Sequence, residues 1–193
     1  MSKTILFIDG ENFLHKIEDV LKKESKTKGF PETVNLDFNK LLSGALKGLD
    51  PSRKIFYGAK LHFNTETPKK SQELIKAQRK LINNLKNQGF EFIMAGNVRG
   101  QKVGSSMVFR EKGVDVKIAV DLVSFACDKK LKTAILCSSD SDLQPAISEA
   151  RKRRVEVIYL GFEISPNKGL TFTTNRTILI RNSEILEASP KKH

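Results

Sequence analysis

The sequence predicts an α/β protein in which helices cover both faces of one mostly parallel sheet. Short apolar runs typical of strands alternate along the chain with amphipathic stretches typical of helices. Several of these runs are apolar at almost every position, as in strands that are buried on both faces. A chain of 193 residues with 39% hydrophobic and 29% charged residues is long enough for one domain with a proper core. We therefore expect a single three-layer α/β/α, Rossmann-like domain over residues 1–193.

The elements alternate in the order expected of βαβ units. The strand candidates are Thr4–Ile8, Arg53–Ala59, Phe90–Ala95, Thr133–Ser138, Val155–Gly161 and Thr177–Arg181. The helical patterns are at about Asn12–Lys23, Leu36–Leu49, Lys69–Asn87, Val114–Cys127 and Ser141–Arg153. This rhythm predicts right-handed crossovers and an open, doubly wound sheet. If the strand order is 3-2-1-4-5, the first and fourth strands are neighbours.

Two segments interrupt the rhythm. Gly96–Arg110 is rich in glycine, serine and basic residues, and Ile164–Asn175 carries proline, glycine, asparagine and threonine. Both compositions indicate loops. Over residues 162–193 we expect a C-terminal strand and a short helix.

Charge and cysteine content limit the function classes. The formal net charge of +12 favours contact with polyanions, although many basic proteins bind no nucleic acid. Cys127 and Cys137 form no CxxC motif, so we expect buried free thiols and neither a zinc site nor a disulfide framework. No signal peptide opens the sequence and no apolar run approaches bilayer length, so we expect a cytoplasmic protein without a membrane segment.

Three acidic clusters carry the chemistry. The clusters are Asp9-Gly10-Glu11-Asn12, Lys112-Gly113-Val114-Asp115 and Ser138-Ser139-Asp140-Ser141-Asp142. The first and third directly follow strands. If those two strands are neighbours, Asp9 and Asp140 would converge where ligands bind in open α/β sheets, beyond the carboxyl ends of the strands. Asp115, at a helix start, would close the cluster from the side.

Clustered carboxylates repel one another unless a cation holds them together. Oxygen ligands suit Mg²⁺ or Mn²⁺, which would polarise a phosphodiester and activate an attacking water.

Other interpretations stay open for single residues. Asp142 or Asp115 alone is explained at least as well by helix capping, and Gly10 by a tight turn. Asp121 lies on a different helix face from Asp115, so a salt bridge is as open as a metal contact.

Together these segments resemble the NYN family, the PIN-like nuclease domains that include the LabA-like proteins. The matching stretches, which agree in order and spacing from about residue 4 to 161, are Phe7–Asn12, Lys112–Leu122 and Ser138–Leu143. The resemblance implies a PIN-like fold and a metal-dependent ribonuclease. It implies that Asp9, Asp115 and Asp140 hold the metal, that Asp142 acts with them in catalysis, and that Asn12, Asp121 and Ser138 support them. Ser139 stands where glycine is common in the family.

The segment before the second cluster is the candidate RNA-binding surface. Its basic residues are Arg99, Lys102, Arg110 and Lys112. They would contact the phosphate backbone, and a solvated mobile loop is an equally open interpretation. Tryptophan is absent and most phenylalanines lie in apolar runs, so we expect recognition of the backbone in single-stranded or flexible RNA.

Three function classes compete. The first is the Mg²⁺- or Mn²⁺-dependent ribonuclease. The second is a catalytically weak RNA-binding or regulatory module that retains the acidic pocket. The third, a phosphohydrolase of small esters, ranks last because Asp9 is followed by Gly10 and Glu11 rather than by a second aspartate two positions on. A homodimer formed through an exposed apolar helix face is left open.

Overall fold

The computed structural model describes residues 3–25, 33–65, 67–103 and 106–189. Within these residues, seven strands form one sheet in the order β4-β3-β2-β1-β5-β6-β7. The strands are β1 (Lys3–Asp9), β2 (Arg53–Lys60), β3 (Glu91–Val103), β4 (Ser106–Lys112), β5 (Leu131–Cys137), β6 (Glu156–Phe162) and β7 (Arg176–Ile180). All neighbouring pairs are parallel except β3 and β4, which are antiparallel.

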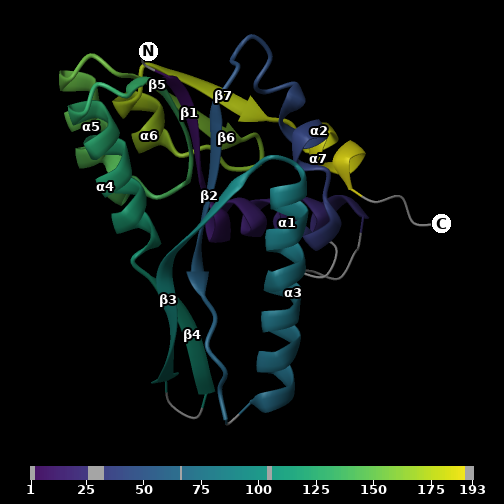
Figure 1. Cartoon of the computed structure of the whole chain (residues 1–193). Helices are drawn as coiled ribbons and strands as arrows, with labels where there is room; N and C mark the ends of the chain where they lie inside the picture. The colour runs from purple at the N-terminus through teal and green to yellow at the C-terminus, as the bar shows by residue number, and fades with distance from the viewer. Residues whose placement is uncertain (1–2, 26–32, 66, 104–105, 190–193) are drawn as a thin grey trace.

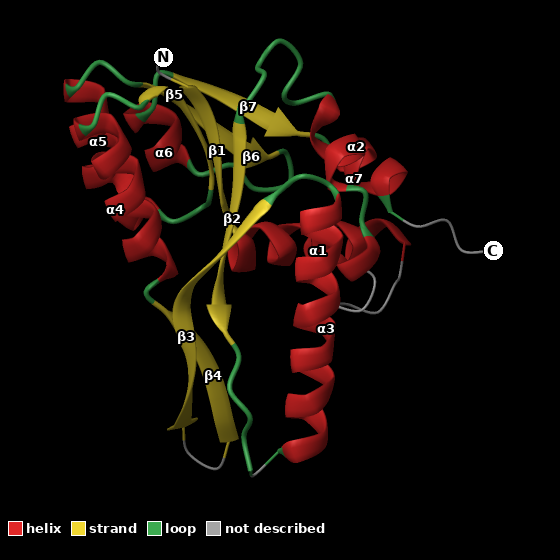
Figure 2. Cartoon of the chain, in the orientation of Figure 1, coloured by secondary structure: helices red, strands yellow, loops and turns green. Residues whose placement is uncertain are grey.

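Helices cover both faces of the sheet (Figure 2). They are α1 (Gly10–Ser25), α2 (Phe38–Ser43), α3 (Pro68–Asn87), α4 (Val114–Cys127), α5 (Gln144–Lys152), α6 (Lys168–Thr173) and α7 (Asn182–Ala188), with 3-10 turns η1 (Thr33–Asn35) and η2 (Ser141–Leu143). One core lies under α1, α2, α3 and α7, and the other under α4, α5 and α6. The predicted α/β, three-layer, mostly parallel fold is confirmed.

Strand β1 shows why the strand runs are continuously apolar. Leu6 and Ile8 pack into the core under α1, whereas Ile5 and Phe7 pack into the core under α4. All four are at most 2% exposed. Alternate side chains point to opposite faces of a strand, so a strand covered on both faces needs apolar residues at every position.

The first and fourth strand candidates are neighbours in the sheet, which is the condition under which Asp9 and Asp140 were expected to converge. β1 lies between β2 and β5, with Ile8 paired to Cys137 at the carboxyl ends of β1 and β5. The sheet order reverses direction at β1, so this edge of the sheet is the place where open α/β folds bind ligands.

The predicted loop over Gly96–Arg110 is wrong. β3 continues to Val103, and β4 pairs with it from Asn97 opposite Lys112 to Val103 opposite Ser106. Figure 1 shows this hairpin extending from the body of the molecule alongside α3. The segment is rich in polar residues and glycine, and its strand pairing depends on backbone hydrogen bonds, so hydrophobic periodicity gave no signal for it.

Other differences are smaller. The segment Ile164–Asn175, expected to be a loop, contains α6, which begins after Asn167; the Asn167 side chain accepts a hydrogen bond from the Leu170 amide. The helical pattern expected over Leu36–Leu49 is confined to α2 and is followed by turns. Cys137 is buried as expected, but Cys127 is exposed because it ends α4 near the surface. Among the described helices, none combines the length and the apolar character that crossing a bilayer requires.

Candidate functional site

Three of the predicted aspartates line one cavity of about 550 Å³. Asp9 ends β1, Asp140 follows β5, and Asp115 lies in the first turn of α4. The cavity lies beyond the carboxyl ends of β1 and β5 and will be called the acidic cavity. The residues that line it are Asp9, Glu11, Asn12, His15, Lys16, Gly113, Val114, Asp115, Ser139, Asp140 and Ser141.

Asp9 is the most constrained of the three. Its side chain is 6% exposed, and its Oδ2 accepts a hydrogen bond from Ser138 Oγ at 2.9 Å. Asn12 donates to it twice, from its backbone nitrogen to Oδ1 at 3.2 Å and from Nδ2 to Oδ2 at 3.3 Å. Burial raises the pKa of Asp9 above its ordinary value, and the bonds from Ser138 and Asn12 act in the opposite direction. Asn12 and Ser138 therefore contact Asp9 in the supporting positions that the sequence suggested.

Gly10 is required by close packing. A Cβ at Gly10 would collide with the ring of Phe56 and with the carbonyl oxygen of Tyr57, 2.5 Å away. The start of α1 therefore lies directly against β2, and any larger residue would push α1 and the Asp9 backbone away from the sheet.

Asp140 is held by a short local network. Its Oδ1 accepts a hydrogen bond from the Asp142 amide at 2.8 Å, and its own amide donates to Ser138 Oγ at 3.1 Å. Ser138 thus contacts the carboxylate of Asp9 and the backbone amide of Asp140, and so links the Asp9 side chain to the backbone that carries Asp140. Asp142 is exposed and does not line the acidic cavity, so the structure does not bring its side chain together with the other three.

Asp115 enters the cavity from the helix side. The residue that caps α4 is Gly113, with φ of 98°, so the capping interpretation does not apply to Asp115. Its half-buried carboxylate has no hydrogen bond or ion pair with any other residue in the described part of the chain. This carboxylate is therefore available to a ligand from the cavity.

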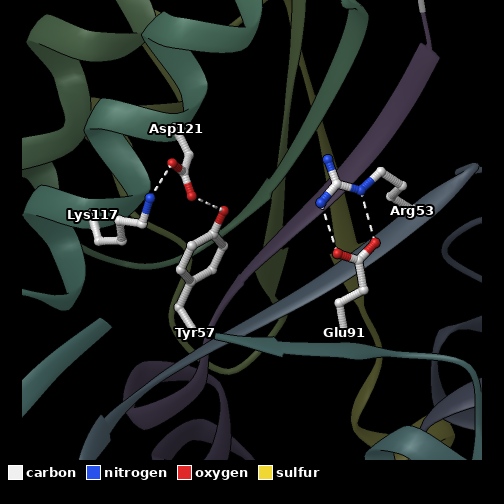
Figure 3. A network of polar contacts seen from close by, with 5 residues as sticks. All are labelled: Arg53, Tyr57, Glu91, Lys117 and Asp121. Carbon is white, nitrogen blue, oxygen red and sulfur yellow. Dashed lines mark hydrogen bonds and ion pairs between the residues drawn. The ribbon is translucent and has the colours of Figure 1, made fainter. Parts of the chain in front are cut away.

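Asp121 does not line the cavity. Its side chain joins α4 to the sheet (Figure 3). Its Oδ2 accepts a hydrogen bond from the Tyr57 hydroxyl at 3.0 Å, and its Oδ1 lies 2.5 Å from Lys117 Nζ. Burial and the neighbouring Asp121 carboxylate raise the pKa of Tyr57 far above its usual range. Of the two roles left open, the structure shows the salt bridge.

Sequence reasoning missed Lys16 as a residue of this site. Its half-buried side chain lines the acidic cavity, and its Nζ donates to Ser165 Oγ at 2.8 Å. Lys16 follows Asn12 by four positions on α1, a spacing that places the two on one helix face. Ser165 lies in the segment between β6 and α6, and no local pattern relates it to Lys16.

The predicted RNA-binding residues lie at the edge of the sheet. Lys112 is exposed at the end of β4, next to the cavity residue Gly113. The backbone register places Arg99 opposite Arg110, and Lys102 further out in β3. The side chains of Arg99, Lys102 and Arg110 are outside the part of the chain that the structure describes.

The acidic cavity is not a preformed multi-ligand metal site. Among the residues that the structure describes, no three acidic, histidine or cysteine side chains form a group that could hold a metal ion. Asp9, Asp115 and Asp140 thus share a cavity without being drawn together around one point.

Comparison with known families assigns the chain to one family. The family profile described as NYN domain matches residues 3–180 of the chain. A comparison with curated proteins found no match. NYN domains are PIN-like nuclease domains, a class whose substrates are nucleic acids and whose members generally use divalent metals. Because the match spans nearly the whole chain, the protein belongs to the NYN domain family.

Proposed function

We propose that this protein hydrolyses phosphodiester bonds of RNA with a divalent cation, Mg²⁺ or Mn²⁺, held by Asp9, Asp115 and Asp140. The observation that carries this proposal is that aspartates from three separate segments line one cavity at the edge of the sheet where open α/β folds bind ligands. The family match supports the same class of reaction.

The donor set suits a hard cation. The cavity offers carboxylate oxygens and no thiolate, which favours Mg²⁺ or Mn²⁺ over zinc. Asp115, and Oδ2 of Asp140, accept no hydrogen bond from the described residues and are free to act as ligands. Because Mg²⁺ usually keeps several of its waters, the cation needs direct contact with only one or two of the carboxylates. A cation held in this way does not require the three carboxylates to converge on one point.

Each side chain has a distinct task in this proposal. A bound divalent cation supplies the positive charge that makes water a better nucleophile and offsets charge on the phosphodiester. Asp9, fixed by Ser138 and Asn12, provides a buried negative charge that stays in place. Lys16, oriented by Ser165, offers an ammonium group to a non-bridging phosphate oxygen.

One observation favours the second candidate function. The cavity has no preformed group of three metal ligands among the described residues, as expected of an RNA-binding or regulatory module with weak or no turnover. The family membership is compatible with both candidates, so cleavage has to be measured directly.

The test compares two matched aspartate variants of the full chain. Purified wild type, Asp140→Asn and Asp128→Asn are incubated with an end-labelled single-stranded RNA in Mg²⁺, in Mn²⁺ and in chelator. Asp128 is an exposed residue at the end of α4 and pairs with Lys130. It lies at the opposite end of the strands from the acidic cavity, so its variant controls for the loss of one carboxylate. We expect metal-dependent cleavage by wild type and Asp128→Asn, and none by Asp140→Asn. Folding is checked by circular dichroism.

Two results would contradict the proposal. Equal cleavage by wild type and Asp140→Asn would remove Asp140 from the site. Binding of RNA without cleavage under any metal condition would favour the regulatory module.

A further inference from the structure

An apolar groove adjoins the acidic cavity. It has a volume of about 330 Å³ and lies between α1, α3 and the strands β2 and β3. Its lining includes Leu14 of α1, Leu74 and Leu81 of α3, and Gly58 and Phe92 of the strands. The volume is within the range of about 300–1,000 Å³ that is typical of small-ligand pockets.

The groove is continuous with two other hollows. Glu11 and His15 line both the acidic cavity and the apolar groove. At its other end, the groove shares Leu61, Leu74 and Val98 with a hollow of about 560 Å³. This distal hollow is also lined by the exposed side chains of His62 and Lys70. An acidic surface, an apolar surface and a polar surface that carries Lys70 thus follow one another along the molecule.

The wall formed by β2 and β3 presents an aromatic ring. Phe92 stacks on the buried ring of Phe56, with centroids 5.8 Å apart and planes inclined by 20°. Gly58 allows this arrangement, since a Cβ there would lie 2.8 Å from Phe92 Cζ. Phe92 is only half-buried, so part of its ring is open to an occupant of the groove.

We propose that the apolar groove binds a nucleobase of the RNA strand whose phosphodiester enters the acidic cavity. A single strand carries a flat apolar base beside each charged phosphate, and the surfaces follow in the matching order. The base would stack on Phe92 in the groove, and the next phosphate would lie near His62 and Lys70 in the distal hollow. The proposal rests on the proposed function, because it takes the acidic cavity as the place where a phosphodiester of the RNA strand is bound.

Two carboxylates in the groove are compatible with this occupant. Glu18 is paired with Lys22 at 3.5 Å, so its charge is partly offset. Glu11 lies at the end of the groove that it shares with the acidic cavity, where a divalent cation would offset its charge. The rest of the lining is mainly apolar, which favours a base over a phosphate at this point.

The first measurement is RNA affinity in chelator, where no cleavage is needed. Fluorescence anisotropy gives the Kd of a labelled oligouridine strand for wild type, Phe92→Leu and Phe172→Leu. Phe172 is 86% exposed on α6, on the other face of the sheet from the groove, and its variant is the matched control. We expect Phe92→Leu to weaken binding by about tenfold, the effect of losing one base–aromatic contact, and Phe172→Leu to leave it unchanged.

A strand of abasic ribose phosphates separates base stacking from a general defect. If the groove binds a base, wild type and Phe92→Leu bind the abasic strand equally. If Phe92→Leu only loosens the fold, it binds both strands more weakly, and the proposal is wrong.

A second measurement uses wild type alone, so it does not depend on a variant that folds. A strand carrying 4-thiouridine is photo-crosslinked to the protein, and the crosslinked peptides are identified by mass spectrometry. We expect crosslinks at Phe92, Leu61 or Leu74. Crosslinks found only outside the groove would overturn the proposal even if metal-dependent cleavage is observed, whereas crosslinks in the groove without cleavage would overturn only the nuclease function. Absence of RNA binding would overturn both.

Discussion

Lys16 differs from the other lysines of this protein whose contacts are described, because its partner is a hydroxyl and it lines an acidic cavity. The bond to Ser165 orients the ammonium group without neutralising its charge. A cation held in this way can meet the charge that develops on a phosphate during hydrolysis.

We therefore expect Lys16→Met to lower kcat/KM for RNA cleavage by about 100-fold, as loss of one charge-stabilising donor does in other enzymes. Lys130→Met removes an exposed charge at the opposite end of the strands from the acidic cavity and should change kcat/KM little. Steady-state kinetics on a labelled RNA gives both values. The phosphate-binding role would be untenable if the two variants lost activity equally.

Single residues also show where sequence patterns stop being informative. Asp9 and Asp140 could be placed from the sequence because Asp9 ends one apolar strand and Asp140 lies in the turn after another. Ser138, two positions before Asp140, could be placed with them. Ser165 could not, because its contact with Lys16 joins positions 149 residues apart and depends on how β6 and α1 pack.

At the scale of elements, α4 is fastened to the sheet by a buried charged contact. Tyr57 of β2 donates to Asp121 of α4, which is also paired with Lys117 (Figure 3). This contact fixes the helix whose first turn carries Asp115. Asp121 therefore acts on the site only through the position of α4.

The two tyrosines of the chain provide a matched test of this fastening. Tyr57→Phe should lower the free energy of unfolding by about 2 kcal/mol, because it removes a buried hydrogen bond to a charged group. Tyr159→Phe should lower it by about 1 kcal/mol, because the Tyr159 hydroxyl accepts a hydrogen bond from the neutral Asn167 amide. Urea denaturation measures both. Equal losses would mean that the Asp121 charge adds nothing to the bond.

A second contact between elements makes stability depend on pH. Arg53 of β2 donates through Nε and Nη2 to the two carboxylate oxygens of Glu91 at the start of β3, each at 2.7 Å. This bond lowers the pKa of Glu91 below its ordinary value of 4.5. A carboxylate with a lowered folded-state pKa stabilises the fold above its unfolded-state pKa, and that contribution disappears as the pH falls through the folded-state pKa.

Glu91→Gln should therefore be slightly less stable than wild type at neutral pH, by at most about 1 kcal/mol because the pair is partly exposed. The difference should shrink as the pH falls below about 4.5 and both proteins carry an uncharged side chain. Thermal unfolding between neutral pH and about pH 3 measures it. A difference that persists unchanged at low pH would contradict the ion-pair explanation.

Elements were predictable to the extent that their own residues stabilise them. The helix Val114–Cys127 was predicted with both ends correct, since Gly113 precedes an apolar helical pattern. The β3–β4 hairpin was missed beyond Ala95, because its strands are held by pairing with each other. Its composition is that of an exposed loop. A hairpin differs from a loop in its backbone pairing, which hydrophobic periodicity does not report.

For the whole molecule, the net charge of +12 predicts the salt dependence of RNA binding. The logarithm of affinity for a single strand should fall linearly with the logarithm of salt concentration, by about 0.7 for each phosphate neutralised. Anisotropy titrations of the Asp140→Asn variant in chelator, at about 50 to 200 mM salt, measure the slope without cleavage. A flat response would show that the basic side chains do not contact the phosphates.

The sequence by itself determined the fold class, the family and the three aspartates that line the cavity, whereas the order of the strands came from the structure. It could do so because buried parallel strands must be apolar throughout and because strand ends in such a sheet meet at one edge. The single-domain organisation, the cytoplasmic location and a homodimer stay predictions. Only the tertiary structure decided that Asp142 and Asp121 lie outside the cavity, that Lys16 lines it, and that an apolar groove adjoins it. These features depend on side-chain directions and on contacts between distant segments, which local sequence patterns do not encode.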